Sequence, residues 1–236
     1  MSAPVHVPQD EAHTFSELLA RARTLATGGR RRILGITGAP GSGKSTLAAR
    51  IARELGEDAV VVPMDGFHLT DHELVRLGRR GRKGAPDTFD VAGYVSLLRR
   101  LREDSSNTVY APEFDRGAEM SVAGAIPVAP HVPLVVTEGN YLLLDVTGWS
   151  DVRPLLDETW FLGPDEKTRV DQLIQRHIDH GKSPQQARDW FQDSDRHNGD
   201  LVAQTRHRAD VIVTRDFGAT DPAPLTDPAL TPRKGP

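Results

Sequence analysis

Cysteine is absent from the 236-residue sequence, and several other functional signals are missing with it. A chain without cysteine forms no disulfide, which suits a reducing cytosol. The nine histidines show no zinc-ligand spacing, so the sequence predicts no zinc site. It contains no run of about 18 apolar residues, and residues 1–10 lack a basic stretch followed by an apolar one. We therefore expect a cytoplasmic protein without a membrane helix or signal peptide.

The sequence also lacks a basic excess, an internal repeat and a heptad pattern. Its 29 basic and 33 acidic residues give a net charge of −4, so nothing favours nucleic acid or an anionic membrane as a partner. Without a heptad seam the sequence does not declare an oligomeric interface, and a homodimer stays possible. With 38% hydrophobic residues the chain can bury a full core, so one α/β domain is expected.

The most informative segment present is the octet at residues 38–45, which satisfies G-x-x-x-x-G-K-[ST], the phosphate-binding P-loop. The apolar residues 33–36 lead into it, and residues 46–55 leave it with helical spacing, as the motif requires. An ordinary glycine-rich turn before a helix is disfavoured by this context. We expect ATP phosphates to contact Gly38, Ala39, Pro40, Gly41, Ser42, Gly43, Lys44, Ser45 and Thr46. Lys44 would reach the β- and γ-phosphates, and the Ser45 hydroxyl would coordinate Mg²⁺.

Strand and helix patterns alternate along the rest of the chain. Strands are expected at residues 59–65, 134–137, 159–162 and 210–214, with a possible short strand at 108–114. Helices are expected at 15–25, 91–102, 165–180 and 184–208. This alternation predicts an α/β P-loop NTPase fold, a doubly wound parallel sheet flanked by helices. We assign 1–13 to a flexible lead, 14–217 to the domain with a small helical lid at about 165–184, and 218–236 to a proline-rich disordered tail.

Two carboxylates follow strands of the predicted sheet, where a parallel sheet collects its ligands. Asp65 could accept the proton of an acceptor hydroxyl or organise Mg²⁺, and the alternative is a capping role. Glu138 could hold the metal, or be an ordinary solvated glutamate. The adjoining Gly139 favours the first interpretation, because glycine lets the backbone approach a ligand.

Two arginines in the expected lid are candidates for neutralising charge during phosphoryl transfer. Arg169 and Arg176 are seven residues apart, so they share a helix face. Planar guanidinium groups suit the charge on a transferring phosphoryl group, whereas an exposed salt-bridging face is the alternative. Arg176 is the stronger candidate, because it lies near the Gly181 break where a lid would hinge.

Four blocks together resemble the uridine kinase/phosphoribulokinase family of P-loop kinases: residues 38–45, 64–68, 82–90 and 138–141. The block at residues 82–90 is particularly similar to the branch that contains type I pantothenate kinase and the bacterial proteins named fructose transport system kinases. Residues 176–184 also resemble the latter proteins. The resemblance runs from about residue 14 to 217. It implies that Asp65 is the base, that Lys44 and Ser45 serve ATP–Mg²⁺, and that Arg176 belongs to the lid. It also implies acceptor contacts after the second strand and around residues 112–116.

The acceptor region departs from the better-known relatives. Residues 111–116 reproduce neither the histidine-bearing, tyrosine-rich segment of pantothenate kinase nor the aromatic and histidine residues of uridine kinase. The acceptor therefore stays open among pantothenate-like molecules, sugars and nucleosides. Candidate substrate-binding residues are Asp65, His68, Lys83, Arg116, Glu138 and Tyr141.

Several of these candidates have an equally plain structural alternative. His68 could be a packed core histidine, and Arg116 could pair with Asp115 and Glu113. Lys83 belongs to a basic insertion within residues 71–86, most of whose charges we expect to be solvated. The rival function is a nucleotide-dependent regulatory ATPase or switch without a small-molecule acceptor. A GTPase is disfavoured, because no N-K-x-D segment is present.

Overall fold

The computed structural model describes residues 10–11, 13–103, 106–146, 148–179, 181–214 and 217. Its strands are β1 (Asp10–Glu11), β2 (Arg32–Gly38), β3 (Ala59–Pro63), β4 (Val109–Asp115), β5 (Met120–Val128), β6 (Leu134–Gly139), β7 (Glu158–Leu162) and β8 (Val211–Val213). Its helices are α1 (Phe15–Ala26), α2 (Lys44–Leu55), α3 (Asp71–Arg76), α4 (Val91–Glu103), α5 (Glu166–Asp179), α6 (Pro184–Trp190) and α7 (Arg196–Ala203). A π-helical turn, Phe191–Asp195, joins α6 to α7. Among the described residues, no helix has both the length and the apolar character needed to cross a membrane.

Six strands form one parallel sheet in the order β1–β8–β7–β2–β6–β3. The chain fills one side of β2 with β3 and β6 and then crosses to the other side with β7 and β8. The predicted doubly wound parallel sheet is confirmed. The carboxyl end of β2 therefore lies at the position where the winding changes direction, which is where such sheets bind ligands.

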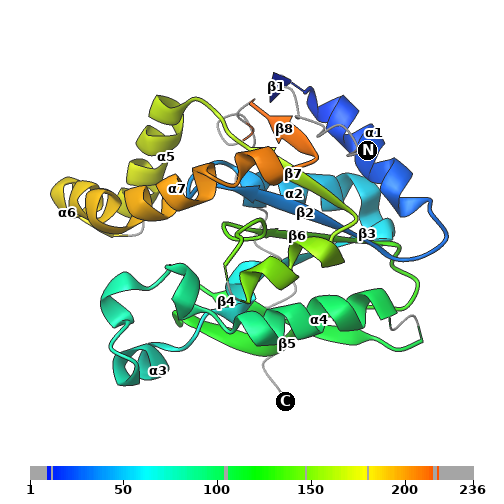
Figure 1. Ribbon diagram of the computed structural model, residues 1–236, viewed down its shortest axis with the longest axis horizontal. Coiled ribbons are helices and arrows are strands. Elements are labelled where there is room, and N and C mark those ends of the chain that lie inside the picture. Colours follow the sequence, from blue (N-terminus) through cyan, green and yellow to red (C-terminus); the bar gives the residue numbers. More distant parts are fainter. Residues whose placement is uncertain are drawn as a thin grey trace, which may run out of the picture.

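Helices cover both faces of the sheet (Figure 1). Alternate residues of β2 enter different cores: Leu34 and Ile36 pack against α1 and α2, whereas Ile33 packs on the side of α4. α1 buries Leu18 and Ala22, and a Thr14–Glu17 capping box begins it. α4 and the β4–β5 hairpin lie together below the sheet in Figure 1. The two cores hold the central strands rigid, so the loops at their carboxyl ends have fixed starting points.

The β4–β5 hairpin is the largest difference from the sequence-based expectation. The predicted strand at 108–114 exists as β4, but it pairs antiparallel with β5 in a separate two-stranded sheet. No sequence pattern predicted β5, because most of its residues are exposed and Gly124 and Pro127 interrupt the alternation expected of a strand. Residues 71–86, expected as an insertion, contain the short helix α3, whose Leu74 is fully buried.

The ends of the chain were predicted to be flexible. Within the lead at 1–13, Asp10–Glu11 pairs with β8 as a short parallel strand. The predicted tail at 218–236 lies outside the described residues.

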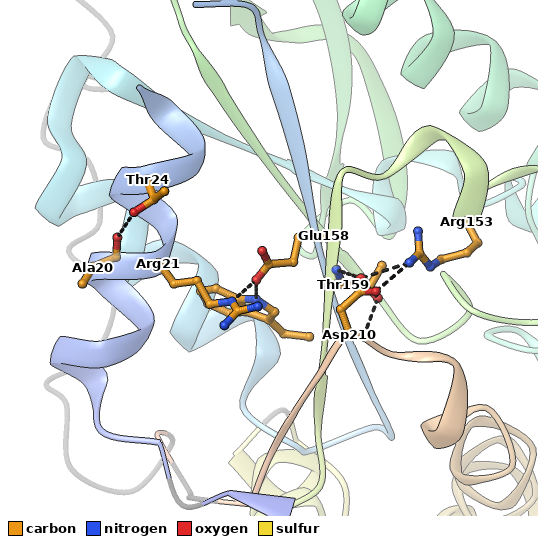
Figure 2. Close-up of polar contacts among 8 residues, drawn as sticks. Ala20, Arg21, Thr24, Arg153, Glu158, Thr159 and Asp210 are labelled. Carbon is orange, nitrogen blue, oxygen red and sulfur yellow. Dashed lines mark hydrogen bonds and ion pairs between the residues drawn. The ribbon is translucent and has the colours of Figure 1, made fainter. Parts of the chain in front are cut away.

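A polar cluster around Asp210 connects the amino-terminal ends of β7 and β8, at the end of the sheet opposite the P-loop (Figure 2). One carboxylate oxygen of Asp210 accepts hydrogen bonds from the Thr159 backbone N–H at 2.7 Å and the Thr159 hydroxyl at 2.8 Å. Arg153 donates to both oxygens, at 2.8 and 3.0 Å. On the other side of β7, Arg21 of α1 pairs with Glu158. Asp210 therefore ties the start of β8 to β7 and satisfies the buried Thr159.

Replacing Asp210 with alanine is expected to lower the free energy of unfolding by about 1–3 kcal/mol, because buried donors of Thr159 lose their acceptor. Denaturant unfolding measures the change. ATP affinity should stay near the wild-type value, because the P-loop lies at the other end of the strands. Asp151→Ala is the control. The Asp151 side chain is 60% exposed and its ion pair with Arg99 is long, at 3.9 Å, so its loss should change stability little. Equal stabilities of the two variants would contradict the assigned role.

Candidate active site

The P-loop connects β2 to α2 and depends on its glycines. Gly41 and Gly43 have φ angles of 82° and 85°, a left-handed conformation that side chains disfavour. At Gly38 an added Cβ would lie 2.5 Å from both the Leu162 carbonyl oxygen and Ser42 Oγ. The loop can therefore wrap tightly around the start of α2. Backbone N–H groups at such a helix start favour phosphate.

Lys44, Ser45 and Glu138 meet at the base of the loop. The Ser45 hydroxyl, in the first turn of α2, donates to Glu138 Oε1 near the end of β6 at 3.0 Å. Burial raises the pKa of Glu138, and the Lys44 ammonium opposes that shift. Burial likewise lowers the pKa of Lys44, while Glu138 and then Asp65 oppose it. The structure thus brings together one cation, two carboxylates and one hydroxyl from segments at the carboxyl ends of three strands, β2, β3 and β6.

Two hollows adjoin the ends of these strands. The loop cavity, of about 200 Å³, is lined by Gly41, Gly43, Lys44, Ser45, Thr46, Gln172, Leu173 and Arg176. The polar cavity, of about 460 Å³, is lined by Asp65, His68, Arg80, Lys83, Gly84, Phe114, Arg116, Glu119, Arg176, His177, Lys182 and Trp190. Arg176 lines both. The smaller cavity at the P-loop and the larger polar cavity therefore adjoin at Arg176.

Asp65 lies in the polar cavity, on a 3₁₀ turn (Met64–Phe67) that follows β3. Its two oxygens lie 3.8 Å from an Arg116 guanidinium nitrogen and 3.9 Å from His68 Nε2. The turn is clamped from two sides. A Cβ added at Gly66 would lie 2.3 Å from the Pro112 carbonyl oxygen, and one added at Gly139 would lie 2.5 Å from Met64 Cβ. Close packing by β4 and the end of β6 therefore fixes where the Asp65 carboxylate points.

Gly139→Ala is expected to displace this turn, because the new methyl group would overlap Met64 Cβ rather than a flexible side-chain end. Overpacking of this kind costs about 1–3 kcal/mol of unfolding free energy. A displaced Asp65 should also lower kcat by about 10²-fold. Gly81→Ala is the matched control, because a Cβ there meets nothing within 4 Å. Denaturant unfolding and turnover of the two variants check the prediction, and indistinguishable results would refute the clamp.

The two lid arginines have different surroundings. Arg169 is 5% exposed, donates to the Pro40 carbonyl oxygen at 2.6 Å and pairs with Glu166. It thus supports the P-loop from behind. Arg176 instead lines both cavities. Of the two arginines, only Arg176 therefore lines the described cavities.

A family model described as methylmalonyl Co-A mutase-associated GTPase MeaB matches residues 5–65 only, the segment that contains the P-loop. The Schizosaccharomyces pombe protein named "Putative uridine kinase C227.14" is 34% identical over 74% of this chain and 78% of its own length. A protein of Leuconostoc citreum named "Uridine kinase" is 32% identical over 62% of this chain and 69% of its own length. The chain belongs to the uridine kinase-related family of P-loop kinases.

A crystal structure supports the same assignment. It is named "putative fructose transport system kinase from Silicibacter sp. TM1040", is 35% identical, and covers 85% of this chain and 98% of its own, with a TM-score of 0.76. The family resemblance inferred from the motifs is confirmed. This P-loop kinase is thus an ATP-dependent phosphotransferase with a hydroxyl acceptor.

The remaining predicted residues of the kinase differ in placement. His68 lines the polar cavity between the rings of Phe89 and Phe114, at centroid distances of 4.0 and 5.0 Å. Burial lowers its pKa, so it is neutral at pH 7. Tyr141, predicted to bind substrate, is instead fully buried and lines neither described cavity. Its hydroxyl donates to the Gly84 carbonyl oxygen at 2.5 Å, so it supports the segment that carries Lys83.

The basic insertion divides into two groups. Arg79 and Arg82 pair with Asp87, and Arg76 pairs with Glu73, so these three are the solvated charges that we expected. Arg80 and Lys83 line the polar cavity. Arg116 also faces the cavity rather than Asp115, whose carboxylate accepts from the backbone N–H groups of Gly117 and Ala118.

Sequence reasoning did not assign functional roles to Glu119, Trp190, Gln172 or Leu173, all of which line a cavity. Glu119 lies at the tip of the unexpected hairpin, so no sequence pattern placed it. Gln172 and Leu173 lie one turn after Arg169 on α5. They line the loop cavity only because of the way α5 is oriented against the P-loop, which the sequence does not show. The Lys182 ammonium lies 4.9 Å from the centre of the Trp190 ring, a cation–π contact. The sequence pattern around Trp190 indicated only a helix.

The donor set near the P-loop fits Mg²⁺ better than a metal bound by protein alone. Among the described residues no group of three or more His, Cys, Asp or Glu side chains could hold a metal. One hydroxyl and one carboxylate, Ser45 and Glu138, meet at hydrogen-bond distance. Mg²⁺ in kinase sites takes one or two such protein oxygens and completes its shell with phosphates and water.

Proposed function

We propose that this kinase transfers the γ-phosphoryl group of Mg-ATP to a hydroxyl of a pantothenate-like, sugar or nucleoside acceptor held in the polar cavity. ATP phosphates would occupy the loop cavity over residues 38–46. The observation that carries the proposal is that Arg176 lines both cavities. A phosphoryl group passing between two chambers needs a cationic group at their junction, since its charge must be neutralised in transit.

Each of the candidate residues would then have a separate role in phosphoryl transfer. Asp65 would orient the acceptor hydroxyl and take its proton as the oxygen attacks the γ-phosphorus. The bond to the β,γ-bridging oxygen breaks and ADP leaves. Lys44 and Arg176 would neutralise the phosphate oxygens. Ser45 and Glu138 would hold Mg²⁺, which withdraws charge from the β- and γ-phosphates.

The lid, about residues 165–184, would close over both cavities. α5 carries Arg176 and His177, and the segment after it carries Lys182, all of which line the polar cavity. Gly181 has a φ angle of 92°, so the chain reverses there in a conformation suited to glycine. Closure would exclude water, whose attack on ATP would compete with transfer.

Measuring ADP release over a panel of pantothenate, nucleosides, ketoses and other sugars tests the proposal. Strong stimulation by one acceptor is the expected result. Uniform slow hydrolysis across the panel would favour the rival function, a regulatory ATPase without a small-molecule acceptor.

A further inference from the structure

Lys83 is a largely buried cation of the polar cavity, and oxygen atoms of Asp71 and Glu119 surround its ammonium. Its side chain is only 10% exposed. Its ammonium nitrogen forms an ion pair with Asp71 Oδ1 at 2.8 Å, and it donates to Glu119 Oε2 at 3.0 Å and to the Glu119 carbonyl oxygen at 3.1 Å, with the Phe114 ring 5.2 Å away. Three oxygens already lie within 3.1 Å of this nitrogen, so a further anionic ligand has to take the place of one of them.

The two carboxylates that hold Lys83 differ in how firmly they are held. Asp71 begins α3 and also accepts from Arg80 Nε at 2.7 Å. The neighbouring Lys83 ammonium holds the pKa of Asp71 below its ordinary value. Glu119 lies on the hairpin tip, with a side chain 63% exposed. An exposed carboxylate exchanges readily for water or another anion, so Glu119 is the partner that can leave.

The backbone at Glu119 is unusual. Its φ is 54°, the one positive value among non-glycine residues in the described part of the chain. This left-handed conformation is disfavoured for glutamate. It directs both the carboxylate and the carbonyl oxygen of Glu119 to Lys83. Strain of this kind gathers at ligand-binding sites.

The charge of the cavity favours an anion. Five cations line it, namely Arg80, Lys83, Arg116, Arg176 and Lys182, against two carboxylates, Asp65 and Glu119. His68 adds no charge at pH 7, because burial lowers its pKa. Even with Asp71 included, the positive charges are in excess. A concave wall with an excess of one charge raises the local concentration of ligands of opposite charge.

Resting on the proposed function, we infer that the acceptor carries an anionic group, a carboxylate or phosphate, that binds Lys83 in place of the Glu119 carboxylate. Glu119 therefore occupies the anion position until the acceptor arrives. A neutral acceptor could accept a hydrogen bond from Lys83 through a hydroxyl oxygen, but it would not replace the negative charge of the Glu119 carboxylate. The acceptor class is a hydroxylated organic anion rather than a neutral sugar or nucleoside.

Matched pairs of probes that differ in one charge test this inference with the full chain. Pantothenate is compared with pantothenol, glycerate with glycerol, and ribose 5-phosphate with ribose, by calorimetric binding and by ADP release. At least one charged member should bind at least about tenfold more tightly than its neutral partner. Equal affinities in every pair, or no binding of any charged member, would overturn the inference.

Two substitutions identify the group responsible. Glu119→Gln keeps size and backbone preference, so it isolates the charge, and it should lower the Kd of the charged probe by about two- to fivefold. Lys83→Met should raise that Kd by about tenfold or more and abolish the effect of Glu119→Gln in the double variant. Glu73→Gln and Lys167→Met are the matched controls, because neither residue lines a described cavity. An unchanged or raised Kd in Glu119→Gln would overturn the inference.

Measuring probe binding and phosphoryl transfer separately distinguishes a failure of the anion site from a failure of the kinase proposal. Charged probes that bind with the expected variant pattern, yet never accept phosphate, would refute the kinase proposal and leave the anion site standing. Neutral probes phosphorylated as efficiently as charged ones would support the kinase proposal and refute the anion site.

Discussion

Asp65→Asn is expected to lower kcat by about 10²–10⁴-fold while ATP affinity stays nearly unchanged. Asparagine keeps the size of the side chain and can still accept hydrogen bonds, but it cannot take up the proton of an attacking hydroxyl. Asp65 lines the polar cavity and does not line the loop cavity. Its loss should therefore affect the acceptor step and spare nucleotide binding.

Steady-state kinetics with the best acceptor and nucleotide titration measure the two effects separately. Asp171→Asn is the control, since Asp171 pairs with Lys167 on the exposed surface of α5. A variant that retains full transfer activity would remove Asp65 from its assigned role. A loss confined to ATP affinity would instead assign Asp65 to metal organisation.

Arg176→Gln is expected to lower kcat by about 10²–10³-fold, because the transferring phosphoryl group loses a positive charge at the junction of the two cavities. Lysine at this position should restore part of the activity, since it supplies charge without the planar fork of donors. Unfolding free energy should change little, because Arg176 lies at the cavity surface.

Arg169→Gln is the informative comparison for this variant. It leaves the Pro40 carbonyl oxygen without its buried donor, so it should lower the free energy of unfolding by about 1–3 kcal/mol and raise the KM for ATP. The opposite pattern, with Arg169→Gln impairing kcat alone and Arg176→Gln impairing stability, would show that the two roles are exchanged.

The sequence was sufficient for the parts of the fold that local patterns determine. The P-loop octet, the apolar runs of β2, β3, β6 and β7 and the helical spacing of α1, α4 and α5 all have short-range signals. Because Asp65 and Glu138 follow strands of a parallel sheet, their meeting near Lys44 also followed from topology.

The acceptor side was less predictable, because long-range packing decides it. Glu119 reaches Lys83 only through a hairpin whose second strand has a weak pattern. Tyr141 lies in the same block as Glu138, yet its ring packs against Phe89 and Trp149 in the core. Nothing in the local sequence distinguishes a tyrosine that faces substrate from one that supports a neighbouring loop.

The most direct test of the central claim is to follow the γ-phosphorus of ATP by ³¹P NMR in the presence of the acceptor that most stimulates ADP release. Transfer across the Arg176 junction predicts a phosphate-ester signal that grows in step with ADP, with little inorganic phosphate. Inorganic phosphate equal to the ADP formed, with no ester for any acceptor, would contradict the account.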